Sequence, residues 1–296
     1  MLAKLTTPQS DMNRLSVVTI NLNNADGLRR TCQSLFTQSF TDYEFIVIDG
    51  GSTDGSVAFL EQHTDRITRW TSEPDRGIYH AMNKGIQFAT GSYCLFLNSG
   101  DWLVSSATLE TVFAHQPQAD IVAGDVYFFD TQANAVKWHI LSPGILTAKT
   151  LFLGTLPHQA TLIRRSLFEQ FGVYNEQLKI ASDWLFFIEA LLERGCSYQH
   201  IAETVAYFST DGISCNPQTN SLPRREQLGV LQQKYPRFLP DYDRLDQLEK
   251  QRTQWLQSRE YAVYQSLERV GVIRAGILAR RLKRFLTRTF LRKRST

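Results

Sequence analysis

Short apolar strands that alternate with helical stretches constrain the fold of this chain most strongly. The runs Leu15–Ile20, Tyr43–Ile48 and Ser92–Leu97 are rich in apolar residues, whereas residues 28–36 and 78–88 carry apolar side chains at helical spacing. Strands that are buried on both faces and joined by helices are typical of a parallel sheet, because right-handed crossovers cover both of its faces. The sequence therefore predicts an α/β fold with a mixed, mainly parallel sheet and helices on both faces.

Acidic residues follow three of these predicted strands. Asp49 follows the strand that ends at Ile48, Asp75 follows a weak strand at residues 67–70, and Asp101 follows the strand that ends at Leu97. Ligands of such sheets bind in the crevice at the carboxyl ends of the strands. One carboxylate there can accept hydrogen bonds from a base or a ribose, and another can hold a divalent ion against a diphosphate. The pattern predicts a nucleotide-diphosphate site, with the alternative that Asp49 and Asp54 only cap the next helix.

The second half of the chain reads as a mixture of helices and strands. We expect a helix around 109–113, a strand at 121–129, a loop that reaches Pro157, a strand at 161–163, a helix from Asp183 and a strand at 205–208. Pro, Asn and Gln become frequent after residue 215, which predicts a boundary there. The predicted organisation is an N-terminal segment 1–14, a domain 15–215 with a nucleotide-binding half 15–101 and an acceptor half 102–215, and a helical basic C-terminal extension 216–296.

Charge is distributed unevenly along the chain. Residues 269–296 contain ten Lys and Arg and no acid, so the rest of the chain has 22 Lys and Arg against 29 Asp and Glu, a net charge of −7. Leu278, Leu282, Phe285 and Leu286 fall on one face of a helix in this tail, which is the composition of an interfacial amphipathic helix. We expect the tail to contact an anionic partner such as the inner leaflet of a membrane, with docking on its own domain as the alternative. The tail has no nucleic-acid recognition motif.

Three ordered motifs give the chain a specific resemblance. Val47-Ile-Asp-Gly-Gly-Ser-Thr-Asp54-Gly-Ser56, the run from Ser72 to Gly85 and Leu95-Phe-Leu-Asn-Ser-Gly-Asp101 are similar to the successive nucleotide-binding motifs of family 2 glycosyltransferases. His158-Gln159 and Ser182-Asp-Trp184 resemble bacterial exopolysaccharide enzymes, including the colanic-acid type. The resemblance covers residues 16 to about 215 and implies a GT-A fold.

The resemblance also implies roles for individual residues. Asp101 matches the metal-binding acid, and Asp183 matches the catalytic base. The remaining expected contacts to the nucleotide sugar are Asn21, Asp49, Asp54, Asp75, Arg76, Asn83 and His158.

Two positions depart from the family pattern. The acidic cluster that is usual in the family is replaced here by Asn98-Ser-Gly-Asp101, so only one carboxylate remains to hold an ion. The affinity for a metal ion should therefore be weak when no nucleotide sugar is bound. The Glu that often precedes the base is Ser182, so another group must orient Asp183.

Other interpretations of single residues remain open. Asp183 could be an N-cap or first-turn acid, since a negative charge stabilises the start of a helix. His158 could donate to the leaving diphosphate or orient the acceptor, or it could be structural. Arg76 and Lys84 could offset phosphate charge, but for Lys84 we expect a solvated side chain on an exposed helix face.

Together these features predict a cytoplasmic inverting glycosyltransferase that is peripheral on the inner face of the plasma membrane and uses Mg²⁺ or Mn²⁺. It would transfer a sugar from a nucleotide-diphosphate donor to a sugar or lipid-linked acceptor hydroxyl in capsule, exopolysaccharide or O-antigen biosynthesis. The alternative enzyme is a sugar-1-phosphate nucleotidyltransferase, although residues 15–24 lack a Gly-rich phosphate loop with Arg and Lys. The non-enzymatic alternative is a protein that binds an anionic surface or nucleic acid through its basic tail.

Overall fold

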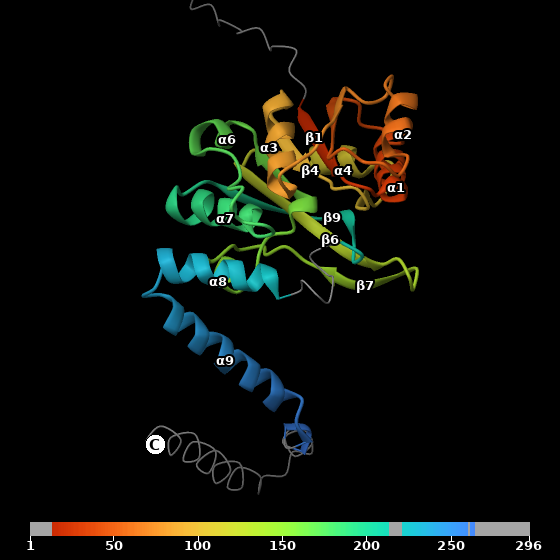
Figure 1. Ribbon diagram of the computed structural model, residues 1–296. Coiled ribbons are helices and arrows are strands. Elements are labelled where there is room, and N and C mark those ends of the chain that lie inside the picture. The colour runs from red at the N-terminus through yellow and green to blue at the C-terminus, as the bar shows by residue number, and fades with distance from the viewer. Residues whose placement is uncertain (1–13, 213–220, 260, 264–296) are drawn as a thin grey trace, which may run out of the picture. The chain divides into compact units, whose positions relative to one another are not determined.

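A computed structural model describes residues 14–212, 221–259 and 261–263 of the chain. Within these residues one sheet has the strand order β3-β2-β1-β4-β8-β6-β9-β5, and β7 pairs with β6 beside this path (Figure 1). The strands are β1 (Leu15–Asn21), β2 (Tyr43–Asp49), β3 (Arg69–Ser72), β4 (Tyr93–Phe96), β5 (Trp102–Leu103), β6 (Ile121–Asp130), β7 (Ala135–Ile140), β8 (Thr161–Arg164) and β9 (Tyr198–Ser209).

Helices connect most of these strands. They are α1 (Ala25–Phe36), α2 (Ser56–Gln62), α3 (Ile78–Phe88), α4 (Thr108–Ala114), α5 (Ala148–Leu153), α6 (Ser166–Phe171), α7 (Ser182–Ile188), α8 (Leu222–Lys234) and α9 (Leu239–Leu256). A short 3-10 turn, η1 (His158–Ala160), precedes β8, and α7 continues into a π-helical turn, η2 (Glu189–Glu193).

The first four strands form the predicted parallel half of the sheet. Strand β1 pairs in parallel with both β2 and β4, and β2 pairs in parallel with β3. The chain therefore moves from β1 to one side of the sheet and returns past β1 to place β4 on the other side. This reversal of strand order beside β1 is the point at which open α/β sheets bind ligands, at the carboxyl ends of the strands.

Helices cover both faces of this half. Val17 of β1 belongs to the same buried cluster as Leu28 and Cys32 of α1, so α1 covers that face. The neighbouring residue Val18 faces the opposite side, where α3 packs so closely that a Cβ at Gly85 would lie 2.3 Å from Val18 Cγ1. Successive side chains of a strand point to opposite faces, and the right-handed crossovers place α1 and α3 accordingly.

The second half of the sheet is mixed. Strand β8 lies between β4 and β6 and pairs antiparallel with both, whereas β6 and β9 pair in parallel along most of their lengths. The pairing brings Ser209, at the end of β9, opposite Phe129 near the end of β6. The carboxyl ends of β6 and β9 therefore lie together.

The segment between β6 and Pro157 differs from the expected loop. It contains β7, which pairs antiparallel with β6, and the helix α5. Every residue of β7 is exposed, and Val136, Trp138 and Ile140 alternate along it. A strand that lies on the surface lacks the continuous apolar run that marks a buried one, so the prediction of a loop was wrong. The helix α6 was also not predicted.

The chain divides into two compact units, at Pro236 and Arg237. Helix α8 belongs to the first unit, where the Glu226 carboxylate accepts hydrogen bonds from the backbone amides of Lys179, Ile180 and Ala181. The predicted boundary near residue 215 stays a prediction.

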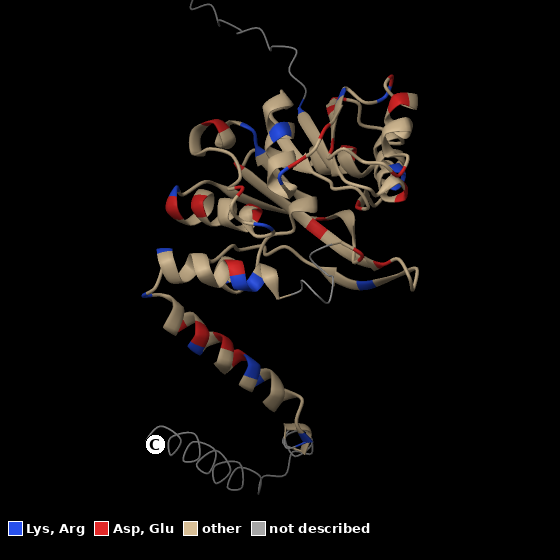
Figure 2. Cartoon of the chain, in the orientation of Figure 1, with Lys and Arg blue, Asp and Glu red and all other residues tan. Residues whose placement is uncertain are grey.

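Helix α9 belongs to the second unit and carries side chains of both charges (Figure 2). The predicted basic amphipathic helix, with Leu278 and Phe285 on its apolar face, lies outside the described residues. Among the helices that the structure describes, none is long and apolar enough to cross a membrane.

Candidate active site

Asp49 at the end of β2 is the centre of a dense set of hydrogen bonds. Its Oδ2 accepts from the Gly51 amide at 3.2 Å, the Ser52 amide at 2.8 Å and the Ser72 hydroxyl at 2.6 Å. Its Oδ1 accepts from Asn21 Nδ2 at 2.7 Å and from the Ser52 hydroxyl at 2.6 Å. Burial alone would raise the pKa of Asp49, but these hydrogen bonds hold it below its ordinary value. Asp49 therefore fixes the loop after β2 to the ends of β1 and β3.

Asp54 lies further along the same loop and joins two helix starts. Its Oδ2 accepts from the Ala25 amide, the first residue of α1, at 2.7 Å, and its Oδ1 accepts from the amide and the hydroxyl of Ser56, the first residue of α2. Free amides at a helix start need such acceptors. The structure thus gives Asp54 the capping contacts that were the alternative to nucleotide binding, and its nucleotide contact stays a prediction.

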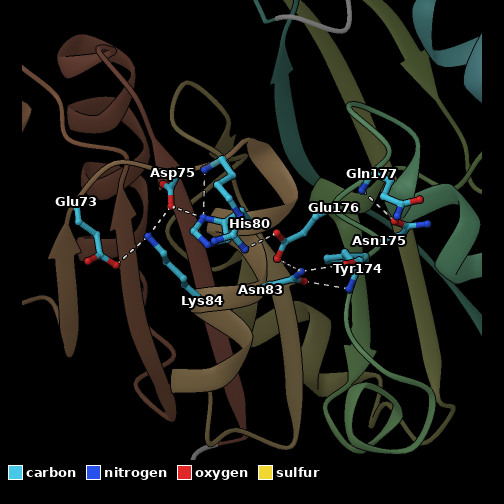
Figure 3. A network of polar contacts seen from close by, with 10 residues as sticks. Glu73, Asp75, His80, Asn83, Lys84, Tyr174, Asn175, Glu176 and Gln177 are labelled. Carbon is cyan, nitrogen blue, oxygen red and sulfur yellow. Dashed lines mark hydrogen bonds and ion pairs between the residues drawn. The ribbon is translucent and has the colours of Figure 1, made fainter.

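Asp75 forms part of the polar network shown in Figure 3. Its Oδ1 lies 3.0 Å from His80 Nδ1 and 2.6 Å from Lys84 Nζ, which also contacts Glu73 at 2.8 Å. Among the described residues, the structure gives Asp75 Oδ2 no hydrogen-bond partner, and this atom lies 3.3 Å from the position of a Cβ on Gly50. The absence of a side chain at residue 50 therefore leaves room for the Asp75 carboxylate above the loop.

Lys84 differs from its sequence-based prediction. Its side chain is only 16% exposed and lies between two carboxylates, those of Glu73 and Asp75, instead of on a solvated face. Burial lowers the pKa of Lys84, but the hydrogen bonds to both carboxylates outweigh this effect and raise it. Lys84 remains charged and neutralises the acidic end of β3.

Arg76 and Asn83 connect α3 and the loop before it to the segment before α7. Arg76 donates to Glu176 at 2.7 Å, although the arginine side chain is 72% exposed. The buried Asn83 donates to the Tyr174 carbonyl and the Glu176 carboxylate, and it accepts from the Tyr174 amide (Figure 3). Their predicted contacts to a nucleotide sugar are not part of this geometry and stay predictions.

Asp101 lies in the turn after β4, at the carboxyl end of that strand. Its side chain is buried, and its Oδ1 accepts from the Ser209 amide at 2.9 Å. Burial raises the pKa of Asp101 to about 7, although the Ser209 amide, the charge of His158 and a hydrogen bond from Gln159 act in the opposite direction. Asp101 is therefore a desolvated carboxylate that a cation would stabilise in its ionised form.

His158 lies between Asn98 and Asp183. Its Nδ1 is 3.2 Å from Asp183 Oδ2, and its Nε2 is 3.3 Å from Asn98 Nδ2. Burial lowers the pKa of His158, but the hydrogen bond and charge of Asp183, with the charge of Asp101, raise it above its ordinary value. The charges of the predicted base, Asp183, and of the predicted metal-binding acid, Asp101, therefore both act on the imidazole.

Asp183 points into this cluster from the first turn of α7. The N-cap of α7 is Ala181, so Asp183 is a first-turn acid and not the cap. Its Oδ1 accepts from the Tyr79 hydroxyl at 2.7 Å, and its Oδ2 contacts His158. Burial would raise the pKa of Asp183, yet the hydrogen bond and charge of His158 and the hydrogen bond of Tyr79 lower it. A buried carboxylate that stays ionised at neutral pH is available to take a proton.

The turn from Asn98 to Asp101 could supply oxygen ligands to a divalent ion. Asn98 Oδ1 is buried without a hydrogen-bond partner, and the Asp101 amide donates to the Asn98 carbonyl within the same turn. In the part of the chain that the structure describes, no group of three His, Cys, Asp or Glu side chains is arranged to hold a metal. This donor set fits a hard cation only if other oxygens complete its coordination.

The family is decided by a match that covers more than half of the chain. A sequence model described as glycosyl transferase family 2 matches residues 16–179. The chain belongs to this family. It is therefore a glycosyltransferase, and the predicted family and enzyme class are confirmed.

Curated relatives in mycobacteria agree with this assignment. An uncharacterised glycosyltransferase of Mycobacterium tuberculosis is 31% identical over 230 residues, which are 75% of this chain and 85% of the relative. A PGL/p-HBAD biosynthesis glycosyltransferase of Mycobacterium bovis is 30% identical over 228 residues, which are 73% of this chain and 86% of the relative.

Solved structures confirm the GT-A-like fold. TarS of S. aureus in complex with UDP has a TM-score of 0.54 at 18% identity, over 66% of this chain and 60% of that one. The mannosyltransferase PcManGT of Pyrobaculum calidifontis, in complex with GDP-Man and Mn2+, has a TM-score of 0.51 at 15% identity, over 86% of this chain and 83% of that one.

The predicted site residues form three groups of contacts, of which Asp75, Arg76 and Asn83 form one with residues of α3 and of the segment before α7. Asn21, Asp49 and Asp54 organise the ends of β1 and β2, while Asp101, His158 and Asp183 cluster after β4, at η1 and on α7. Sequence reasoning missed Tyr79 as the partner of Asp183, because the two residues are 104 positions apart. The one available signal was that Tyr79 lies inside the second family motif.

Proposed function

We propose that this glycosyltransferase transfers a sugar, with inversion, from a nucleotide-diphosphate sugar to an acceptor hydroxyl, with Asp183 as the base. The observation that carries the proposal is the buried cluster in which His158 contacts Asp183, while the nearby charge of Asp101 also raises the pKa of His158. Family membership supports the sugar transfer itself and favours it over nucleotidyl transfer.

Asp183 would accept the proton of the acceptor hydroxyl during the transfer. The acceptor oxygen forms a bond to the anomeric carbon while the bond from that carbon to the diphosphate oxygen breaks, and the nucleoside diphosphate leaves with the electron pair. The acceptor proton goes to Asp183, whose two oxygens offer about four lone-pair sites, of which Tyr79 and His158 use two. General-base help of this kind contributes roughly 10²–10⁴-fold.

The nucleoside would bind at the ends of β1, β2 and β3. Asp75 is the most suitable contact to the nucleoside, because its Oδ2 has no partner among the described residues and lies over Gly50. Asp49 would act through the loop that it holds, since five donors already use its oxygens. Uridine and guanosine donors are the first to test, because S. aureus TarS was solved with UDP-GlcNAc and PcManGT with GDP-Man.

Asp101 would be the protein ligand of a Mg²⁺ or Mn²⁺ ion. The orphaned Asn98 Oδ1 and the desolvated Asp101 carboxylate fit a hard cation whose remaining ligands come from a bound diphosphate. Such an ion supplies positive charge to the departing diphosphate. The ion in the PcManGT complex, Mn2+, supports this choice of metal.

The acceptor would be a surface polysaccharide precursor or a glycolipid in a bacterium. The resemblance to exopolysaccharide enzymes and the names of the mycobacterial relatives, which refer to PGL/p-HBAD biosynthesis, support this class of acceptor. A lipid-linked acceptor would also explain an enzyme with ten basic residues in its last 28 positions, on the cytoplasmic face of the membrane.

The deciding experiment measures release of nucleoside diphosphate from UDP-GlcNAc, UDP-glucose, GDP-mannose and dTDP-glucose, with and without Mn²⁺. We expect one donor to be hydrolysed in a metal-dependent way, and Asp183→Asn to lower kcat by about 10²-fold or more while donor affinity stays nearly unchanged. Asp241→Asn, at an exposed first-turn acid of α9, is the matched control. An Asp183→Asn enzyme with normal kcat would refute the base.

A further inference from the structure

Asp183 is held in place by a residue from a distant helix. Tyr79 lies in the first turn of α3 and donates its hydroxyl to Asp183 Oδ1 at 2.7 Å, and both side chains are buried. The residue that precedes Asp183 does not take this role, because Ser182 Oγ is buried without a partner among the described residues. The side chains that contact the Asp183 carboxylate, Tyr79 and His158, therefore both come from outside α7.

Asn83 fixes the helix that carries Tyr79. Tyr79 and Asn83 are four positions apart on α3 and so lie on the same face of the helix. Asn83 forms two hydrogen bonds with the backbone of Tyr174 (Figure 3). The Tyr174 ring packs against the Tyr79 ring with centroids 5.5 Å apart. Tyr79 is therefore held by the contacts of its ring and of Asn83 with Tyr174, in a position from which its hydroxyl already donates to Asp183.

The hydroxyl is a permanent donor in this position. Burial raises the pKa of Tyr79 well above its ordinary value, and the nearby charge of Asp183 raises it further. Tyr79 cannot exchange protons with Asp183 at neutral pH, so its effect on the carboxylate is to orient it and to stabilise its charge.

We propose that Tyr79 is a positioning residue, which holds Asp183 Oδ1 so that the remaining lone pairs of the carboxylate face the acceptor hydroxyl. The proposal rests on the assignment of Asp183 as the base. His158 holds the other oxygen, so the carboxylate is fixed at both ends. Tyr79 contacts neither the donor nor the acceptor and acts only through Asp183.

The test compares two tyrosine-to-phenylalanine variants in the same core. Tyr79→Phe removes the hydrogen bond to Asp183, whereas Tyr174→Phe removes a buried hydroxyl that has no hydrogen-bond partner among the described residues. The readout is hydrolysis of the nucleotide sugar that the wild type turns over in the donor panel above, with water as acceptor. Rates are divided by the number of donor-binding sites, so that unfolded molecules do not contribute.

We expect Tyr79→Phe to lower kcat by about 10-fold or more, which corresponds to loss of a hydrogen bond to a charged group. Donor affinity should stay within about twofold, because the nucleoside would bind at the ends of β1, β2 and β3 and not at Tyr79. When kcat is plotted against pH, its acid limb should move to higher pH, since loss of the hydrogen bond from Tyr79 raises the pKa of Asp183. The groups that face Asp183 are Tyr79 on α3, His158 on η1 and, at longer range, Tyr174 before α7.

Three results would overturn the proposal. One is a Tyr79→Phe enzyme with the kcat and pH profile of Tyr174→Phe. Another is a fall in kcat that runs in step with donor affinity and melting temperature, while the acid limb stays in place. The third is a further loss when Tyr79→Phe is added to Asp183→Asn, because a residue that acts through Asp183 has no effect without it. A normal kcat in Asp183→Asn alone would instead refute the proposed base.

Discussion

The replacement of Asp49 by Asn tests how the loop after β2 is held. The wild-type carboxylate accepts five hydrogen bonds, three at Oδ2 and two at Oδ1. An asparagine that keeps its oxygen at the Oδ2 position retains the three donors there, but these bonds lose the assistance of the charge. Its amide group then faces Asn21 Nδ2 and the Ser52 hydroxyl, both of which act as donors in the wild type.

The surroundings can absorb part of this change. The Asn21 amide can rotate so that its Oδ1, which is buried without a partner among the described residues, accepts from the new amide. Hydrogen bonds to charged groups contribute about 1.5–3 kcal/mol each and neutral ones about 0.5–1.5 kcal/mol, while relief from burying a charge offsets some of the loss. We therefore expect Asp49→Asn to destabilise the protein by about 2 kcal/mol. For a domain of this size that lowers Tm by about 4–8 °C.

Asp49→Ala should be more destabilising, because it leaves all five donors without their acceptor. Removing one partner of a buried charged network costs about 3–5 kcal/mol. The comparison of the two variants by urea unfolding therefore measures how much of the network an amide can replace.

The stability difference between the wild type and Asp49→Asn should depend on pH. The folded structure lowers the pKa of Asp49, so the carboxylate stabilises the protein above the unfolded pKa of about 3.9 and loses this effect as pH falls through the lower folded value. Asparagine does not titrate, so the two proteins should converge in stability at acid pH. An Asp49→Asn protein with unchanged Tm at pH 7 and strongly weakened donor binding would refute this reasoning and favour direct contact with the nucleotide.

Three further changes test other parts of the molecule. Asp101→Asn should abolish metal-dependent donor binding while the fold survives, and calorimetry that finds equally metal-dependent binding would reject Asp101 as the metal ligand. Truncation after Leu267 removes the ten basic residues of the tail, so the shortened enzyme should no longer sediment with anionic liposomes but should keep its donor hydrolysis; unchanged sedimentation would argue for a docked tail. Gly85→Ala places a methyl group 2.3 Å from Val18 Cγ1 and should destabilise by about 1–3 kcal/mol in thermal unfolding, whereas an unchanged Tm would mean that α3 can move away from β1.

Local sequence patterns were sufficient to predict the strands of the nucleotide-binding half, residues 15–101. The apolar runs around Val17 and Phe45 predicted β1 and β2 because strands buried on both faces leave a continuous signal in the sequence. The same rule located Asp49 and Asp101 at one edge of the sheet, since parallel strands end together. The exposed strand β7 gave no such signal, and its pairing with β6 had to come from the structure.

The sequence by itself determined the family, the order of β1 to β4 along the chain and the acidic residues that follow β2, β3 and β4, because each of these depends on residues that are close in the chain. Only the tertiary structure decided which partners those residues have. Asp183 meets Tyr79 across 104 positions, and Lys84 lies between Glu73 and Asp75 instead of in solvent. Such contacts depend on how α3 and α7 pack against the sheet, and no local pattern encodes that packing.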